Sequence, residues 1–283
     1  MNTKGQKLFL YLFAALLTFS LYSNGVKATD YTNYFGIEMT ETQYNNLLNQ
    51  GFLEEEIYYM NEETFNENKD LTAMLASVTS KYYKSIYTDL NGNPQTVELT
   101  KSEYENESSN QMRGYVETEY KRMDAFITKI DNTYFRYKVT TAWKNMPSVR
   151  SYDIIGLAFT NTDVYIPGNV RFQFNYCVSS GDCYADGSYY DKQKNYNGGS
   201  AVYKFPTDAV SMTAMLYYDV SKNTTETITS QLIHGDYAHA IANVHSGIYT
   251  EHVMTRGGIS LSTNAAQYYD AIPCADTGWT GSW

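Results

Sequence analysis

The stretch "TYFRYKVTTAW", residues 133–143, alternates between apolar and polar side chains. Successive side chains of an extended chain point to opposite faces, so its aromatic and aliphatic residues share one face and its basic residues share the other. The apolar face is made of Phe135, Tyr137, Val139 and Trp143. Arg136 and Lys138 fall on the other face. This pattern predicts a half-buried antiparallel strand with one side on a core and one side in water.

The same period recurs on both sides of this stretch. Residues 80–90 and 95–104 flank "NGNP" (91–94), a hairpin signal because Asn-Gly accepts positive φ and Pro suits the start of the next strand. Residues 117–130 precede 133–143 across another short turn. Further strands are predicted at 152–159, 170–178, 200–205, 212–220, 228–241 and, more weakly, 257–263. The chain is therefore expected to be mainly β, with an antiparallel β-sandwich or barrel-like domain.

A helical pattern precedes the strands. Thr40 and Gln43 have the spacing of a capping box at the start of a helix. Gly51 followed by Phe52 fits a glycine C-cap, in which the apolar residue after the glycine packs back on the helix. The acidic start of "EEEIYYM" (54–60) suits the positive end of a second helix. We expect a short N-terminal helical hairpin, with a third helical turn around 62–65 as an alternative.

The Gly51-Phe52 dipeptide resembles the Gly-Phe loop after the first helix of ubiquitin-associated three-helix modules, and no function is inferred from it. We expect an acidic helical cap on the next domain, with a linking helix near 70–76. The predicted organisation is a signal peptide at 1–28, a helical N-terminal region at 29–76 and a Tyr-rich β-sandwich domain at 77–283.

Residues 1–28 have the three parts of a secretory signal. Lys4 and Lys7 give a positive start, and an apolar run follows at 8–21. The segment "VKA" ends at Ala28 and has small side chains at the two positions that signal peptidase recognises. The run is shorter than the roughly 20 residues that span a bilayer. We predict cleavage after Ala28, an extracellular protein and no stable membrane anchor.

The charge of the chain restricts its partners. With 21 basic and 31 acidic residues, its formal net charge is −10. An acidic surface repels phosphate backbones and anionic headgroups, so we expect no nucleic-acid partner. An extracellular glycan or protein is the expected partner. The overall character resembles that of secreted proteins of Gram-positive bacteria.

Three cysteines in an exported chain predict one disulfide and one remaining thiol. Cys177 and Cys183 flank "VSSGD", whose Ser, Gly and Asp residues favour a turn. The two cysteines are therefore expected to face each other across a hairpin. Cys274 is then unpaired. The alternatives are a bridge from Cys274 to either of the others, and three reduced thiols.

The histidines invite a metal or catalytic interpretation, because three lie in "HGDYAHAIANVH" (234–245) and the fourth is His252. Their spacing fits neither one face of a strand nor the i, i+4 pair of a helical zinc motif. Structural or surface roles are therefore favoured. A secreted hydrolase that uses Cys274 with a histidine, or paired carboxylates, is kept as an alternative.

The acidic loop "GDCYADGSYYD" holds Asp182, Asp186 and Asp191. It lacks the acidic residues at alternate positions and the closing glutamate of a helix-loop-helix calcium site. We expect a solvated loop and no cofactor, with extracellular calcium as the alternative.

Tyrosine is the strongest compositional bias, at 29 residues. Its ring is a rigid amphipathic surface common in binding sites, although it is also favoured within strands. Adjacent tyrosines on a strand point to opposite faces, so some are expected at the surface. The binding candidates are Tyr189, Tyr190, Tyr268 and Tyr269. The sequence favours a secreted binding or structural protein over an enzyme, and the Ser/Thr-rich segment 221–231 suggests a β-pore-forming toxin as a further alternative.

Overall fold

The computed structural model describes residues 30–87, 94–106 and 117–283. The predicted signal peptide and most of the predicted "NGNP" turn lie outside these residues. The strands on either side of that turn do pair, as Ile86 lies opposite Gln95.

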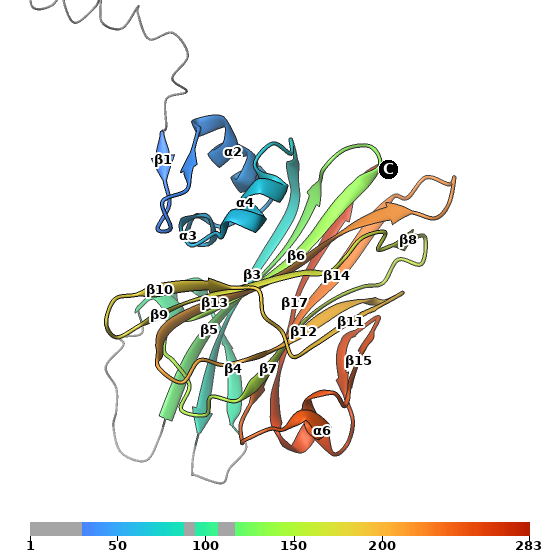
Figure 1. The fold of residues 1–283 in the computed structure, drawn as a ribbon. Helices are drawn as coiled ribbons and strands as arrows, with labels where there is room; N and C mark the ends of the chain where they lie inside the picture. Colours follow the sequence, from blue (N-terminus) through green and yellow to red (C-terminus); the bar gives the residue numbers. More distant parts are fainter. Residues whose placement is uncertain (1–29, 88–93, 107–116) are drawn as a thin grey trace, which may run out of the picture.

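Two stacked antiparallel sheets form a β-sandwich-like body (Figure 1). Within the described residues, the larger sheet has eight strands in the order β10-β9-β13-β6-β5-β3-β4, with β8 paired to β13. Its strands are β3 (Met74–Tyr87), β4 (Gln95–Leu99), β5 (Glu117–Lys129), β6 (Tyr134–Trp143), β8 (Val164–Tyr165), β9 (Arg171–Val178), β10 (Cys183–Asp186) and β13 (Ala209–Lys222).

The smaller sheet has five strands in the order β11-β12-β7-β14-β17, counted within the described residues. They are β7 (Tyr152–Phe159), β11 (Asp191–Asn195), β12 (Gly198–Lys204), β14 (Ser230–Ala240) and β17 (Tyr269–Thr280). Both sheets have edge strands, which corrects the barrel-like alternative.

Tyrosines fill much of the space between the sheets. Tyr83, Tyr137, Tyr203, Tyr218 and Tyr237 each keep 1% or less of their surface exposed. The buried hydroxyls find acceptors, as the hydroxyl of Tyr218 donates to the Leu157 carbonyl at 2.8 Å. Part of the tyrosine bias is therefore a property of the core, because tyrosine packs like phenylalanine when its hydroxyl is hydrogen-bonded.

Residues 30–73 form a helical cap. It contains the small hairpin β1 (Tyr31–Thr32) and β2 (Glu38–Met39), followed by α2 (Glu41–Asn49), α3 (Glu54–Tyr58) and α4 (Glu62–Asn68). Thr40 and Gln43 make the expected capping box, and Gly51 ends α2 with a φ of +83° while Phe52 is buried. The predicted two-helix hairpin is not confirmed, since three short helices are present. The predicted linking helix at 70–76 is wrong, because β3 begins at Met74.

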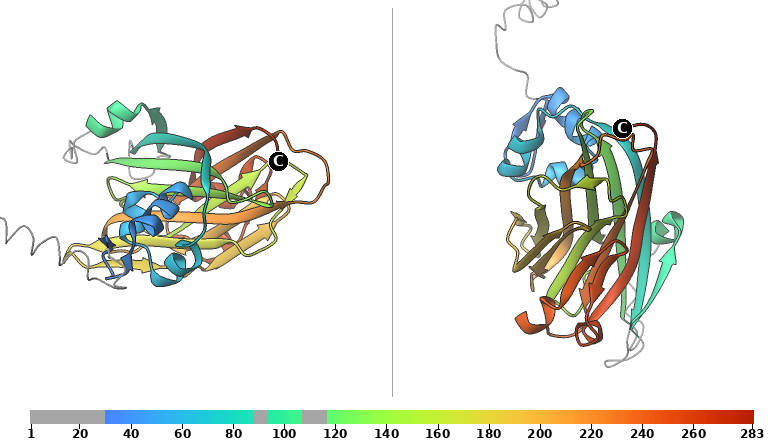
Figure 2. Two further views of the ribbon diagram at one scale, coloured as in Figure 1. Left: turned by 90° about the horizontal axis from the view of Figure 1, so that it is seen from above. Right: turned by 90° about the vertical axis from the view of Figure 1, so that its right-hand side faces the viewer.

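The helical cap packs on the outer face of the larger sheet, beside β6 and β13 (Figures 1 and 2). Leu47 and Phe52 of the cap share an apolar cluster with Met215 and Tyr217 of β13. As a result β6 is buried on both faces along most of its length. This corrects the half-buried strand expected from its alternation.

The outer face of the smaller sheet is covered by α6 (Ser246–Tyr249), the hairpin β15 (His252–Thr255) and β16 (Gly258–Leu261), and the short helix η1 (Ala265–Gln267). Gly156 of β7 allows this close approach, because a Cβ there would lie 2.6 Å from Cγ1 of Ile259.

Two further expectations are corrected. Residues 101–106 form α5 (Lys101–Asn106) where the strand was expected to continue, and β17 was not predicted.

Candidate binding cleft

His239 and Asp153 form a pair buried between the two sheets. Neither side chain is exposed, and Nδ1 of His239 lies 2.9 Å from Oδ2 of Asp153. The carboxylate also accepts the Tyr237 hydroxyl and the Ala240 amide. Burial, with Asp153 beside it, raises the pKa of Tyr237 well above its ordinary value. This network satisfies a carboxylate inside the core and presents no atom to a ligand, which supports a structural role.

The other histidines are used separately. His252 is buried, with Nδ1 2.8 Å from the Tyr249 carbonyl and Nε2 2.9 Å from the Ser200 hydroxyl. His234 pairs with Asp276 at 2.7 Å. His245 caps α6. Among the described residues, no three His, Cys, Asp or Glu side chains are grouped to hold a metal ion.

The acidic loop has local uses for its carboxylates. Asp182, Asp186 and Asp191 each accept a hydrogen bond from a residue two positions away in the chain. Such bonds stabilise turns. The described residues therefore supply no ligand cluster for the calcium alternative.

The β9–β10 hairpin is closed by the predicted disulfide between Cys177 and Cys183. The two cysteines lie directly opposite in the strand register, and Tyr184 lies opposite Tyr176. The covalent bond therefore holds two tyrosines side by side. The side chain of Cys274 lies outside the described residues, so its free state stays a prediction.

A cavity of about 390 Å³, here called the aromatic cleft, opens where this hairpin meets the edge of the smaller sheet. Its lining comes from β9, the end of β10, the β10–β11 connection, β12 and the β12–β13 connection. The lining residues are Phe174, Tyr176, Asp186, Ser188, Tyr190, Lys204, Phe205, Pro206, Thr207 and Asp208. Aromatic rings, two carboxylates, hydroxyls and one ammonium thus share one small space.

Stacked rings form one wall of the aromatic cleft. The Tyr176 ring lies between those of Phe174 and Tyr184, with centroid distances of 5.7 and 5.1 Å and interplanar angles of 18° and 24°. Burial raises the pKa of Tyr176, and the carboxylates of Asp186 and Asp208 raise it further. Hydrogen-bond acceptors therefore lie near an aromatic platform.

Of the four tyrosines predicted to bind a ligand, Tyr190 lines the aromatic cleft. It is 54% exposed and packs edge-on against Tyr152 at 4.8 Å. Tyr189 is also exposed but lies under Lys192, whose Nζ is 4.3 Å from its ring centroid. Tyr268 is partly buried, and Tyr269 is buried with 5% of its surface exposed. Their roles in binding stay predictions.

The sequence reasoning missed Tyr176, Tyr184, Lys204 and Asp208. The sequence does contain a signal for Tyr176 and Tyr184. Alternation along 170–178 puts Phe174 and Tyr176 on one face, and a hairpin closed by the disulfide puts Tyr184 opposite Tyr176. Lys204 and Asp208 come from another part of the chain, and only the fold brings them to the aromatic cleft.

No protein-family model and no curated protein matches the chain. Among solved structures, it is similar to the pilus backbone RrgB of Streptococcus pneumoniae, with 11% identity and a TM-score of 0.29 over 40% of this chain and 26% of that one. It is also similar to the collagen-binding domain of the Erysipelothrix rhusiopathiae surface protein RspB, with 7% identity and a TM-score of 0.27 over 59% of this chain and 66% of that one. The chain therefore spans less than two thirds of either. These values are too low to bear on function. Within the described residues, no helix is long and apolar enough to cross a membrane.

Proposed function

We propose that the protein is an extracellular binding protein that holds part of a glycan in the aromatic cleft. The observation that carries this proposal is the combination of a stacked aromatic wall with Asp186, Asp208 and Lys204 around one cavity. A sugar ring has an apolar face of C–H groups and a rim of hydroxyls. Tyrosine rings suit the first, and carboxylates and an ammonium suit the second.

The cleft is also built to keep its shape. The disulfide fixes the β9–β10 hairpin, and the Tyr190 amide donates to the Val202 carbonyl at 2.8 Å. A preformed site loses less conformational entropy on binding than a flexible one. The disulfide and the predicted signal at 1–28 both support a location outside the cell, since disulfides persist in oxidising compartments.

Binding of the mature chain, residues 29–283, to an array of cell-wall and mucin-type glycans tests the proposal. The replacement Tyr190→Ala should lower the affinity for the best-bound glycan about tenfold, because one well-packed ring contributes about 1 to 3 kcal/mol to the binding free energy. Tyr176→Ala should have a similar or larger effect. Tyr189→Ala is the matched control, since it removes an exposed tyrosine of the same loop outside the lining.

Equal affinities for Tyr190→Ala, Tyr176→Ala and the unmodified protein would refute the aromatic cleft as the site. If the chain instead binds a host surface protein, and Tyr190→Ala weakens that binding, the ligand of the aromatic cleft is a protein and not a glycan. Release of sugar from the bound glycan, lost in Asp186→Asn or Asp208→Asn, would favour the hydrolase alternative. The segment that suggested a pore-forming toxin connects β13 to β14, and dye leakage from liposomes tests that alternative.

A further inference from the structure

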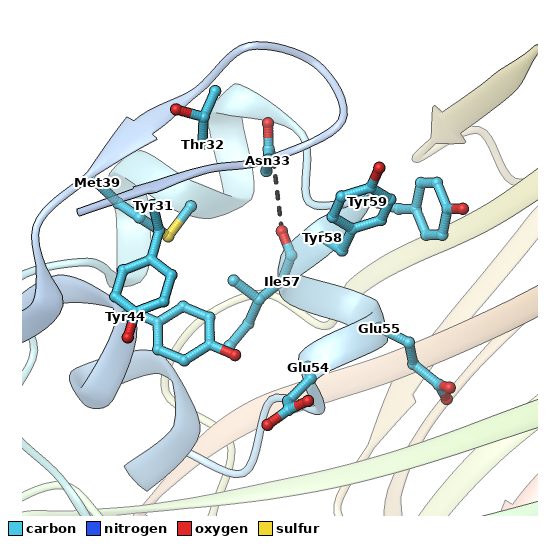
Figure 3. A pocket seen from close by; sticks show the side chains of 10 residues that line it. All are labelled: Tyr31, Thr32, Asn33, Met39, Tyr44, Glu54, Glu55, Ile57, Tyr58 and Tyr59. Atoms are coloured by element: carbon cyan, nitrogen blue, oxygen red, sulfur yellow. Dashed lines mark hydrogen bonds between the residues drawn. The ribbon is translucent and has the colours of Figure 1, made fainter. Parts of the chain in front are cut away.

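We propose that a second cavity, in the helical cap, binds an organic ammonium group. This cap cavity has a volume of about 390 Å³. Tyrosines and two glutamates of α3 are among the side chains that line it (Figure 3). The residues that matter are Tyr31, Tyr44, Tyr58, Tyr59, Glu54 and Glu55.

Aromatic rings line the cap cavity from separate elements. Tyr31 of β1 and Tyr44 of α2 stack in parallel, with centroids 4.2 Å apart and an interplanar angle of 8°. Tyr58 meets Tyr59 edge-on at 4.7 Å. Tyr31 and Tyr58 keep 40% and 48% of their surface exposed. The electron-rich faces of such rings attract cations.

The charged residues that line the cap cavity are both acidic. No Lys, Arg or His is among the described residues that line it. Glu55 forms an ion pair with Arg122 of β5, whereas Glu54 makes no hydrogen bond or ion pair within the described part of the chain. The Glu54 carboxylate is close enough to Tyr44 to raise the pKa of its phenol, after the larger effect of burial. An unpaired carboxylate beside aromatic rings favours a cation over a neutral or anionic ligand.

The cap cavity is held open by the cap itself. The Asn33 side chain donates to the Met60 carbonyl at 2.8 Å, which ties the β1–β2 turn to the end of α3. Met39 and Ile57 are buried beneath the tyrosines. The volume suits a methylated ammonium head or the end of a lysine side chain. A free small molecule and a lysine of a partner protein are the two sources of that group.

The test is a calorimetric or NMR titration of the mature protein with choline and with 3,3-dimethylbutan-1-ol, the neutral carbon analogue of the same shape. Choline should bind at least tenfold more tightly, because only the cation gains from the rings and from Glu54. A trimethyllysine peptide and its leucine counterpart form the second arm. Stronger binding of choline indicates a small-molecule source, and stronger binding of the peptide indicates a protein source.

Glu54→Gln and Tyr58→Leu should each weaken choline binding about fivefold or more, and Tyr58→Phe should keep most of it because the ring remains. Glu63→Gln is the matched control, since it removes an exposed glutamate of α4 outside the lining. Equal binding of choline and its neutral analogue, or no ammonium binding at millimolar concentration, would overturn the proposal. None of these changes should alter glycan binding in the aromatic cleft, so the two sites fail or succeed independently.

Discussion

Lys138 and Glu56 are fully buried where the helical cap meets β6. Nζ of Lys138 lies 2.6 Å from Oε2 of Glu56 and also donates to the Gly51 carbonyl and the Thr140 hydroxyl. Burial lowers the pKa of Lys138, and Glu56 opposes that shift. A buried ion pair of this kind adds little net stability, but either charge left alone is costly.

Lys138→Met should therefore lower the free energy of unfolding by about 3 to 5 kcal/mol, because Glu56 stays buried without its cation. Adding Glu56→Leu should recover much of this loss. Urea unfolding of the chain over residues 29–283 measures both effects. A double variant that is less stable than the single one would contradict this expectation, because Glu56 would then stabilise the fold without its cation, through the Leu53 amide and the Thr140 hydroxyl.

His252 makes stability depend on pH. Burial lowers its pKa below the ordinary value of 6.5, against the opposing effect of the Tyr249 carbonyl. As pH falls, the His252 imidazole of the unfolded chain is protonated at a higher pH than that of the folded chain. Neutral His252 therefore contributes its full stability to the folded state above about pH 6.5, and this contribution is lost as pH falls through the folded pKa. His252→Gln should flatten the fall in melting temperature between pH 7.5 and 5. An unchanged slope would contradict this assignment.

At the scale of elements, the β9–β10 hairpin joins the disulfide to the aromatic cleft. Cys177→Ser with Cys183→Ser should lower the free energy of unfolding by about 2 kcal/mol or less, since the closed loop is short. It should also weaken glycan binding, because Tyr176 and Tyr184 are no longer held together. Cys274→Ser, expected to remove an unpaired thiol, is the control for both urea unfolding and glycan affinity. A Cys274→Ser variant as unstable as the double variant would point to another pairing.

The contrast between β9 and β17 shows which strands could be predicted. Strand β9 has clear alternation and a turn followed by Cys183, so its existence and its disulfide follow from the sequence. Strand β17 contains Pro273 and Gly278, which disfavour a strand pattern. It lies at the sheet edge, where the register shifts between Gly235 and Tyr237 of β14, and an edge or a bulge tolerates proline. Such tolerance depends on neighbours that the local sequence does not reveal.

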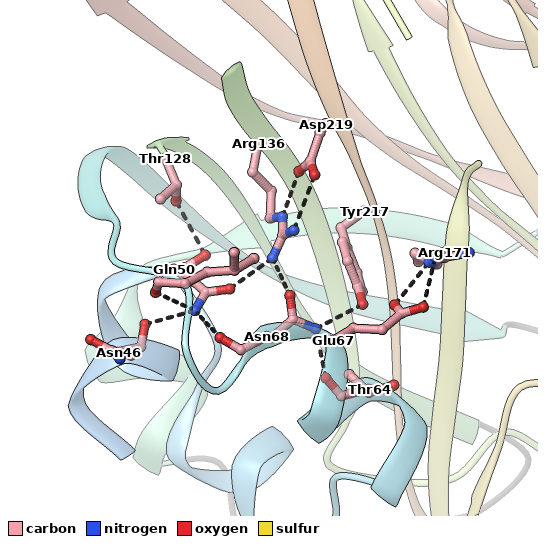
Figure 4. Close-up of polar contacts among 11 residues, drawn as sticks. Asn46, Gln50, Thr64, Glu67, Asn68, Thr128, Arg136, Arg171, Tyr217 and Asp219 are labelled. Carbon is pink, nitrogen blue, oxygen red and sulfur yellow. Dashed lines mark hydrogen bonds and ion pairs between the residues drawn. The ribbon is translucent and has the colours of Figure 1, made fainter. Parts of the chain in front are cut away.

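On the scale of the whole molecule, the helical cap joins the larger sheet through a polar network (Figure 4). Arg136 of β6 donates to Asp219 of β13 and to Gln50 and Asn68 of the cap. Asn68 in turn donates to the Tyr217 hydroxyl. Alternation correctly put Arg136 on the face opposite the core, but it carried no information on what covers that face. The partners of a strand face, like those of the aromatic cleft, are set by contacts distant in sequence.

This network has a consequence for the order of folding. Asn68 and Tyr217 are 149 residues apart, and the cap helices have between five and nine residues each. Helices that short are unstable alone, so we expect the cap to lack part of its docking surface until β13 has paired with β6. We expect Glu56→Gln to speed unfolding while leaving the refolding rate nearly unchanged in stopped-flow measurements. Until the cap docks, we expect its acidic residues to stay hydrated and to repel one another, which disfavours association between partly folded chains.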